Sequence, residues 1–211
     1  MKYEKIRNQV LEAILEAVDL GLIKGTSGNI AVQDEEEVVA ITPSGISYKT
    51  MKAEDIAIVD MNGKWLDGPY KPSSETPMHT AVLRARKDIK ATVHTHGMFA
   101  TIMAMDDEGL QPTTPPQSEF VPINIVPFVM PGSDTLADTV VNTLGEGRAV
   151  LLRNHGMFCC GKNIKDAMAA TIYTEEMATT AYYAKLLGNF KPLPEEAIQK
   201  MQALIAADKA V

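Results

Sequence analysis

Helical segments and short apolar strand segments alternate along almost the whole 211-residue chain. Each amphipathic helix must bury its apolar stripe against a neighbouring layer, and strands spaced between helices favour a sheet as that layer. The alternation therefore predicts an α/β fold with three layers, α/β/α. The many short strands favour a mixed sheet over a wholly parallel one. At this length the simplest organisation is a single domain spanning 1–211.

Several residues mark where these elements begin and end. Gly21 is a helix stop, and Ser74 is the expected N-cap of a helix that holds Pro77 in its first turn. Asn62-Gly63 suits a type I′ hairpin turn, and Pro127 restricts its strand to a sheet edge or a bend. The predicted helices span 2–20, 75–86, 133–144, 163–187 and 194–209, the first strands span 29–33 and 38–41, and 109–122 forms an ordered loop.

Composition and charge narrow the class of protein. The formal net charge is -7 and no basic tract is present, which argues against a nucleic-acid or anionic-membrane partner. The N-terminus lacks a secretory apolar core, and no apolar run is long enough to cross a bilayer. Cys159 and Cys160 are neighbours, so strand alternation points them to opposite faces, and we expect no disulfide. They could be soft metal ligands, or an inert pair with one thiol in the core and one at the surface. A cytoplasmic enzyme is the class that fits.

Three of the four histidines are placed to share one metal ion. His94 and His96 lie in the run ATVHTHG at the end of a strand, where residues two apart project from the same face. His155 follows a second apolar strand at an Asn-His-Gly turn. Three neutral imidazoles leave at least one position open on zinc, as in catalytic sites. Manganese, cobalt or iron would also accept these ligands, and the alternative is that each histidine is only a polar residue at a strand end.

Three polar, glycine-containing stretches could together hold an anion. Residues 24–29 (KGTSGN) and 42–45 (TPSG) offer backbone N–H groups and hydroxyls. Residues 71–75 (KPSSE) place Ser73 and Ser74 at a helix start, where the helix dipole favours phosphate. Taken singly, each stretch is equally explained as a turn with a cap. A protein of negative net charge must gather such donors locally to bind a phosphate.

Glu75 is the candidate acid–base residue, one position inside the expected helix start. The alternative is a first-turn glutamate that only complements the helix dipole. His79 lies four residues further on and shares a helix face with Glu75. It could support Glu75 as a hydrogen-bonded partner, serve as a fourth metal ligand, or be a structural histidine.

These motifs together resemble a known family. The order GTSGN, ITPSG, SSE-x-x-x-H, VHTH and NHG is similar to that of class II aldolases and epimerases, most of all the L-fuculose-1-phosphate aldolases. The resemblance runs from about residue 5 to 190, and five ordered motifs are more specific than any one. It implies an α/β/α sandwich around a mostly antiparallel sheet. It also implies a cyclic homotetramer with active sites between subunits.

The resemblance also assigns roles to particular residues. It implies that His94, His96 and His155 bind zinc and that Glu75 is the base. Glutamate in the SSE motif resembles the aldolases, because the epimerases carry aspartate there. The residues that would then hold the substrate phosphate are Thr26, Asn29, Ser44, Gly45, Ser73 and Ser74.

The implied reaction is cleavage of a ketose 1-phosphate to dihydroxyacetone phosphate and an aldehyde through a zinc-stabilised enediolate. Glu75 would move the proton next to the carbonyl, from within hydrogen-bond reach and with a pKa raised by its surroundings. The chain departs from the fuculose aldolases in lacking a tyrosine in the loop QPTTPPQSEF and at the C-terminus AADKAV. Glu119 or solvent could take over the second proton transfer, or the substrate could differ.

Two other functions fit the same motifs. A sugar-phosphate 4-epimerase or a dehydratase would use the same enediolate chemistry. A non-catalytic interaction module, similar to the adducin head domain, would keep the fold alone. Retention of all three histidines and Glu75 argues against such a scaffold, which has no need for them.

Overall fold

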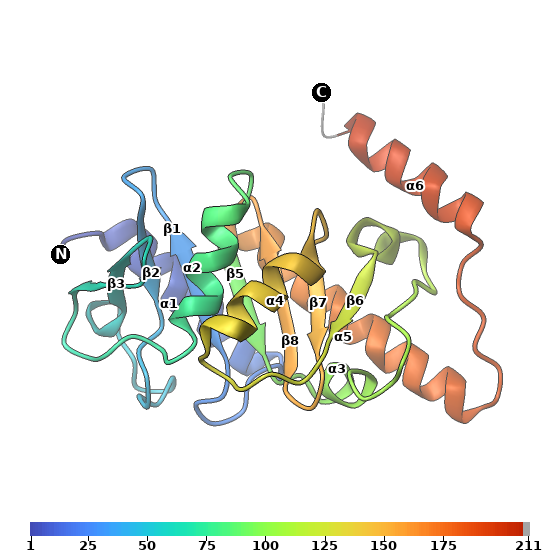
Figure 1. Cartoon of the computed structure of the whole chain (residues 1–211), viewed down its shortest axis with the longest axis horizontal. Helices are drawn as coiled ribbons and strands as arrows, with labels where there is room; N and C mark the ends of the chain where they lie inside the picture. Colours follow the sequence, from blue (N-terminus) through green and yellow to red (C-terminus); the bar gives the residue numbers. More distant parts are fainter. Residues whose placement is uncertain (209–211) are drawn as a thin grey trace.

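A mixed eight-stranded sheet forms the centre of the computed structural model, which describes residues 1–208 (Figure 1). The strands are β1 (Asn29–Gln33), β2 (Val38–Ile41), β3 (Ala57–Asp60), β4 (Trp65–Asp67), β5 (Ala91–Thr95), β6 (Ile123–Val126), β7 (Ala149–Leu152) and β8 (Gly156–Gly161). The α-helices are α1 (Glu4–Asp19), α2 (Thr76–Ala85), α3 (Met98–Met103), α4 (Asp134–Leu144), α5 (Ile164–Leu186) and α6 (Glu195–Asp208), and two short 3-10 helices are η1 (Ala53–Asp55) and η2 (Pro115–Phe120).

The strand order is β4-β3-β2-β1-β5-β8-β7-β6. Every neighbouring pair is antiparallel except β6 and β7, which are parallel. The expectation of a mixed, mostly antiparallel sheet is therefore confirmed. Strand β6 lies at the sheet edge and ends directly before Pro127, as predicted from that proline.

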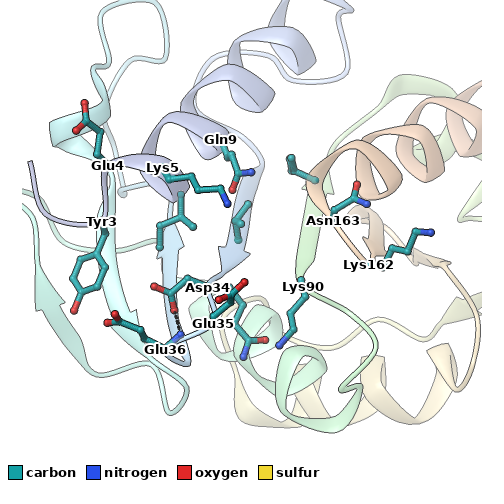
Figure 2. A pocket seen from close by; sticks show the side chains of 14 residues that line it. Tyr3, Glu4, Lys5, Gln9, Asp34, Glu35, Glu36, Lys90, Lys162 and Asn163 are labelled. Atoms are coloured by element: carbon teal, nitrogen blue, oxygen red, sulfur yellow. Dashed lines mark hydrogen bonds between the residues drawn. The ribbon is translucent and has the colours of Figure 1, made fainter.

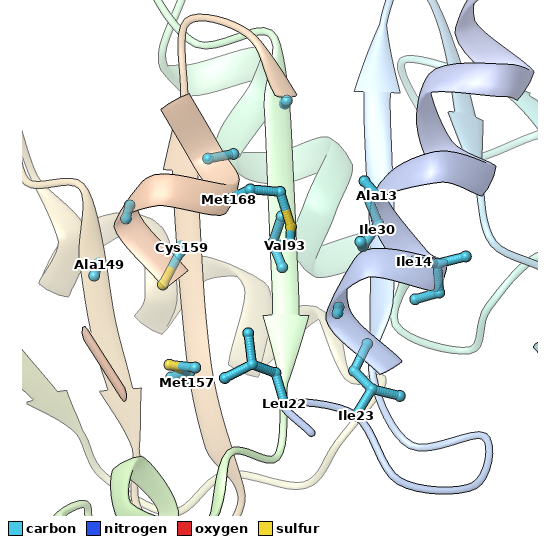
Figure 3. Packing of buried hydrophobic residues seen from close by; sticks show 14 of the residues in the cluster. Ala13, Ile14, Leu22, Ile23, Ile30, Val93, Ala149, Met157, Cys159 and Met168 are labelled. Atoms are coloured by element: carbon cyan, nitrogen blue, oxygen red, sulfur yellow. The ribbon is translucent and has the colours of Figure 1, made fainter. Parts of the chain in front are cut away.

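Helices cover both faces of the sheet and make the expected three layers. Helices α1, α3 and α5 pack on one face, and part of this core is seen in Figure 3. Helices α2 and α4 pack on the other. Cys159 belongs to the first core and Cys160 to the second, so the prediction of opposite faces is confirmed. The expectation of a surface thiol is wrong, because both faces are covered and both free cysteines are fully buried. Burial raises the pKa of Cys159 to about 12, which makes this thiol inert.

The helix ends follow the predicted signals closely. Gly21 has a φ of +72° and donates its N–H to the carbonyl oxygen of Val18, while Leu22 donates to Ala17, which together end α1 in a Schellman motif. The side chain of Ser133 accepts the N–H of Leu136 at the start of α4. Asn163 caps α5 in the same way. The last helix is described to Asp208, so its predicted end at Lys209 lies outside the described residues.

The β3–β4 hairpin is present, but its turn is not of the expected type. A type I′ turn needs a positive φ at both central residues. Gly63 has a φ of +82°, whereas Asn62 has no positive φ. The N–H of Gly63 donates to the carbonyl oxygen of Asp60, and the N–H of Asp60 donates to that of Lys64, both at 2.9 Å. The strands are thus joined by a three-residue loop that ends on a left-handed glycine.

The segment 109–122 is ordered, as expected, but it contains the 3-10 helix η2. The buried side chain of Gln117 holds this segment by accepting the backbone N–H of Thr113 at 2.8 Å and donating to Glu176 of α5 at 3.1 Å. Helix α6 is attached to it through Gln202, whose amide donates to the carbonyl oxygens of Ser118 and Val121. Within residues 1–208, none of the helices combines the length and apolar character needed to span a membrane.

Candidate active site

Three histidines converge at one end of the sheet. His94 is the fourth residue of β5, His96 follows the end of that strand, and His155 lies in the turn between β7 and β8. That turn is formed by Asn154, whose φ of +55° is left-handed and therefore tolerated by asparagine. The three ring centroids lie 4.7–5.0 Å apart, and the ligand nitrogens lie within 4.8 Å of one another. The structure thus brings the three predicted ligands together.

The unprotonated ring nitrogens of these histidines face one another. The Nδ1 of His94 lies 2.8 Å from the carbonyl oxygen of Met157 and must donate to it, so Nε2 carries a lone pair. That Nε2 lies 3.0 Å from the Nε2 of His96. Burial, followed by the proximity of His94, lowers the pKa of both His96 and His155 to about 4, so their rings are neutral. A tetrahedral zinc ion would separate its nitrogen ligands by ~3.3 Å. The donor set therefore fits a divalent metal.

Glu75 faces the same point from α2. Its Oε2 lies 3.1 Å from the Nε2 of His94, and its Oε1 lies 3.3 Å from the Nε2 of His155. The expectation that Ser74 caps this helix is wrong. Helix α2 begins at Thr76 with Glu75 as N-cap, because the side chain of Ser73 binds the N–H of Glu75 and turns the carboxylate inward.

The pKa of Glu75 is lowered, not raised as expected for a catalytic acid–base group. Burial raises it, but the proximity of His94 and the hydrogen bond from Asn29 outweigh burial and hold the pKa well below its ordinary value. The carboxylate is therefore ionised, which is the form that accepts a proton.

Asn29 and His79 lie beside Glu75, and Asn29 pairs with His94 where β1 runs along β5. Asn29 donates its amide N–H to the Oε2 of Glu75 at 3.0 Å. Both ring nitrogens of His79 have partners, Thr92 at 2.6 Å and Asn29 at 2.5 Å. His79 is thus a hydrogen-bonded histidine that reaches Glu75 through Asn29, not a fourth metal ligand.

The three anion-binding stretches lie next to one another. The N–H of Ser44 donates to the carbonyl oxygen of Lys71, and the N–H of Ser73 donates to that of Thr42. Gly28 packs against His94, which places the first stretch beside the histidines. The side chain of Ser73 is buried, but most of the other expected phosphate contacts are exposed and free to meet a ligand: Thr26, Ser44, Gly45 and Ser74.

Tyr48 links two of these stretches and was not singled out from the sequence. Its hydroxyl donates to the carbonyl oxygen of Gly28 at 2.5 Å, with the carbonyl oxygen of Thr26 3.4 Å away. Burial raises the pKa of Tyr48 to about 12, so the phenol stays protonated and keeps donating. No sequence pattern pairs a tyrosine with a loop 20 residues earlier.

Glu119 is not placed at this site within its own chain. It lies in η2, shortly before Ile123, and Ile123 pairs with Ala149 at the start of β7. His155 follows the other end of β7, so the strand length separates the two residues. A single subunit therefore does not offer Glu119 as the second acid–base group.

The cavity of Figure 2 lies at the opposite end of the sheet from the histidines. Its volume is about 680 Å³, and its lining includes Gln33 at the end of β1 and Lys90 just before β5. Its lining carries both lysines and carboxylates, and the side chain of Asp34 is engaged in the β1–β2 turn. It has neither the imidazoles nor the donor-rich loops, so it is distinct from the candidate active site.

The chain matches the family described as class II aldolase and adducin N-terminal domain, over residues 8–182. The chain belongs to this family. Its sequence is 36% identical over 204 residues to a 5-deoxy-D-ribulose 1-phosphate aldolase of Bacillus thuringiensis serovar kurstaki, covering 95% of each chain. It is 31% identical to an L-fuculose phosphate aldolase of Haemophilus influenzae, covering 97% of this chain and 94% of that one.

A solved structure agrees with these relatives. An L-fuculose 1-phosphate aldolase superimposes with a TM-score of 0.92 at 31% sequence identity, and the match covers 98% of both chains. The resemblance inferred from the five motifs is thereby confirmed, as is the class II aldolase fold. The chain is an enzyme of the class II aldolase type.

Proposed function

We propose that this enzyme cleaves a ketose 1-phosphate to dihydroxyacetone phosphate and an aldehyde. The observation that carries the proposal is the meeting of three imidazoles, the Glu75 carboxylate and three donor-rich loops at one end of the sheet. Two of the relatives are named for ketose 1-phosphates that differ in the rest of the sugar. The shared part of such substrates is the phosphate end, which matches the donors gathered here.

His94, His96 and His155 would hold one divalent metal ion, and we propose zinc. The ion would supply Lewis-acid stabilisation of the negative charge that develops on the substrate oxygens. The protein fixes the geometry of the first ligand, since the carbonyl oxygen of Met157 orients the ring of His94.

Glu75 would move the proton at C3 of the substrate. In cleavage, a base from a neighbouring subunit or solvent takes the proton of the C4 hydroxyl, and the C3–C4 bond breaks so that C4 becomes the aldehyde carbon. The electron pair of that bond passes into the enediolate, and Glu75, which first takes up a proton from water, gives this proton to C3. In the reverse direction the ionised carboxylate takes that proton. The carboxylate is only 7% exposed, so bulk water does not compete for it.

The phosphate would be held by Thr26, Ser44, Gly45, Ser73 and Ser74, with Asn29 at their edge. In this structure the amide of Asn29 is engaged by Glu75 and His79, so we assign it to the carboxylate as well as to the substrate. The phosphate donors do not react. They orient the substrate so that C3 meets Glu75.

We propose a homotetramer in which a neighbouring subunit completes each site. The support is indirect. Within residues 1–208, no obvious proton acceptor for the C4 hydroxyl other than Glu75 lies beside His94, and a loop with exposed apolar side chains contacts the segment that leads into Glu75. Phe128 and Met130, in the loop that reaches Ser74 through Gly132, are 53% and 66% exposed. Light scattering on the active enzyme tests this, and an active monomer at assay concentration would refute it.

A 4-epimerase or dehydratase is the competing reaction at the same site. Glu75 and the names of the relatives favour the aldolase. The test is to measure bound metal and then assay the protein against a panel of ketose 1-phosphates and pentulose 5-phosphates. We expect one divalent ion per chain and release of dihydroxyacetone phosphate from at least one ketose 1-phosphate.

Two variants test whether metal and activity depend on the histidine site. His155→Ala should lose both metal and activity, whereas Lys162→Ala, in the charged cavity at the far end of the sheet, should keep both. Full metal occupancy in the His155 variant would disprove the metal site. Epimerisation of a pentulose 5-phosphate without release of dihydroxyacetone phosphate would replace the aldolase by the epimerase.

A further inference from the structure

Four buried polar side chains form one hydrogen-bonded chain behind the site. It runs from Thr92 on β5 to His79 on α2, then to Asn29 on β1, and ends on the Oε2 of Glu75. The successive distances are 2.6, 2.5 and 3.0 Å. None of the four residues is more than 7% exposed. Water therefore does not supply alternative partners.

The donors in this chain all point toward Glu75. The amide nitrogen of Asn29 can only donate, so its contact with Oε2 turns the amide oxygen toward His79. The Nε2 of His79 must then carry the ring proton and donate it. Burial, followed by the proximity of His94, lowers the pKa of His79 to about 3, so the ring holds a single proton. Its Nδ1 accepts from the hydroxyl of Thr92.

This directed chain makes the two oxygens of Glu75 unequal. Oε2 accepts from Asn29, whereas Oε1 is buried without any hydrogen-bond partner and lies 3.3 Å from the Nε2 of His155. An amide turned the other way would place its oxygen against the carboxylate. The carboxylate disfavours that turn, and a His79 tautomer with its proton on Nε2 supports the orientation seen, because that N–H needs an acceptor on Asn29.

We propose that His79 is a positioning residue that acts through Asn29 to hold the Glu75 carboxylate with Oε1 free toward the reacting carbon. This rests on the proposed role of Glu75 as the base. A merely structural His79 would fill space beside Phe158, whose ring it contacts edge-on at 5.2 Å, and its loss would change stability alone. A positioning His79 also changes the rate of proton transfer.

Nitrogen-15 NMR of the zinc-loaded wild-type enzyme tests the chain without any substitution. With labelled histidine, His79 should show a protonated Nε2 and a bare Nδ1 at neutral pH. A proton on Nδ1 would reverse the direction of the chain and overturn the proposal.

Two substitutions then separate positioning from packing. The amide nitrogen of His79→Gln reaches about as far as Nε2, so this variant can still donate to Asn29. His79→Asn reaches only as far as Nδ1 and cannot. We expect His79→Asn to lower kcat for exchange of the C3 proton of dihydroxyacetone phosphate by about 10–100-fold with KM changed less than about 3-fold, because small misplacements at a reacting group have effects of this size. His79→Gln should stay within about 5-fold of wild type.

Thr80→Val is the matched control. This buried threonine is the next residue of α2, but its hydroxyl binds only carbonyl oxygens of its own helix turn, at Thr76 and Pro77. It should leave kcat unchanged. If His79→Asn exchanges the proton as fast as wild type, the positioning role is wrong. If the wild-type enzyme exchanges no proton at all, the proposed function is wrong instead, and the NMR tautomer alone then decides whether the chain exists.

Discussion

Gly28 packs so closely against His94 that a Cβ at Gly28 would lie 2.8 Å from the carbonyl oxygen of His94. The φ of Gly28 is +113°, which side chains of L-residues rarely adopt. The stretch 24–29, a candidate anion-binding segment, and the strand that carries two candidate metal ligands are therefore in contact through the backbone alone, with no side chain between them.

Replacing Gly28 by alanine tests this contact. We expect Gly28→Ala to lower the free energy of unfolding by more than ~2 kcal/mol, from backbone strain and the collision with His94, and to weaken metal binding. Gly25→Ala is the control, since Gly25 also has a positive φ of +64° but nothing within 4 Å of its added Cβ. It should lose only about 1 kcal/mol. Equal losses by urea unfolding would show that the contact with His94 is unimportant.

Replacing Glu75 by glutamine tests the base. The amide keeps the size of the side chain but cannot accept a proton, so exchange of the C3 proton should slow by about 10²–10⁴-fold. Metal content should stay nearly unchanged, because three imidazoles remain. Loss of a helix-dipole contact alone, worth roughly 0.3–1 kcal/mol, would slow exchange far less. The exposed Glu146→Gln is the control. Near-normal exchange in Glu75→Gln would move the base elsewhere.

The double variant Ser73→Ala/Ser74→Ala tests the phosphate site. Hydrogen bonds to a charged ligand contribute roughly 1.5–3 kcal/mol each, so the Kd of dihydroxyacetone phosphate should rise by about 10-fold or more. Ser133→Ala removes the N-cap of α4 instead. It should lower stability by about 1 kcal/mol and leave the Kd unchanged. Calorimetry that finds wild-type affinity in the double variant would reject these serines as phosphate ligands.

His79 should make the metal-free protein sensitive to acid. Burial lowers the pKa of His79 to about 3 in the folded state, whereas its ordinary value, which applies to the unfolded chain, is 6.5. Between these two pH values the unfolded chain therefore binds more protons than the folded protein. Stability is then fully present above pH 6.5 and falls as the pH is lowered toward 3. Urea unfolding at several pH values should show a slope smaller in His79→Gln than in wild type, by up to about 1.4 kcal/mol per pH unit. Identical slopes would contradict a neutral buried His79.

Local signals predicted much of the fold. Ser133, Asn163 and Gly21 mark helix ends because each acts on backbone groups within a few residues of itself. The alternation of β5 likewise places His94 and His96 correctly. Helix α3 was missed, because its short apolar sequence has no cap of its own. The carboxylate of Glu175, more than 70 residues away, accepts the first N–H groups of α3 from Phe99 and Ala100.

The convergence of the three histidines was predicted from the sequence, but the hydrogen bonds that hold Glu75 were not. The five motifs name Glu75 and Asn29, yet nothing local says that their side chains meet, since 46 residues separate them. The N-cap of α2 likewise depends on a contact between residues far apart in the sequence. Ser74 has the better capping side chain, but pairing of Ser73 with Thr42 on another stretch moves the helix start to Thr76.

The donor atoms of the site come from both halves of the sheet. Strand β5 joins them, with β1 on one side and β8 on the other. The candidate ligands His94 and His155 are 61 positions apart (155 − 94), so a partly folded chain cannot gather the same ligands. Binding of the proposed ion would therefore be linked to completion of the whole sheet, and its occupancy should raise the unfolding temperature of the entire chain. Scarcity of the metal would in this way become a shortage of folded enzyme as well as of active enzyme.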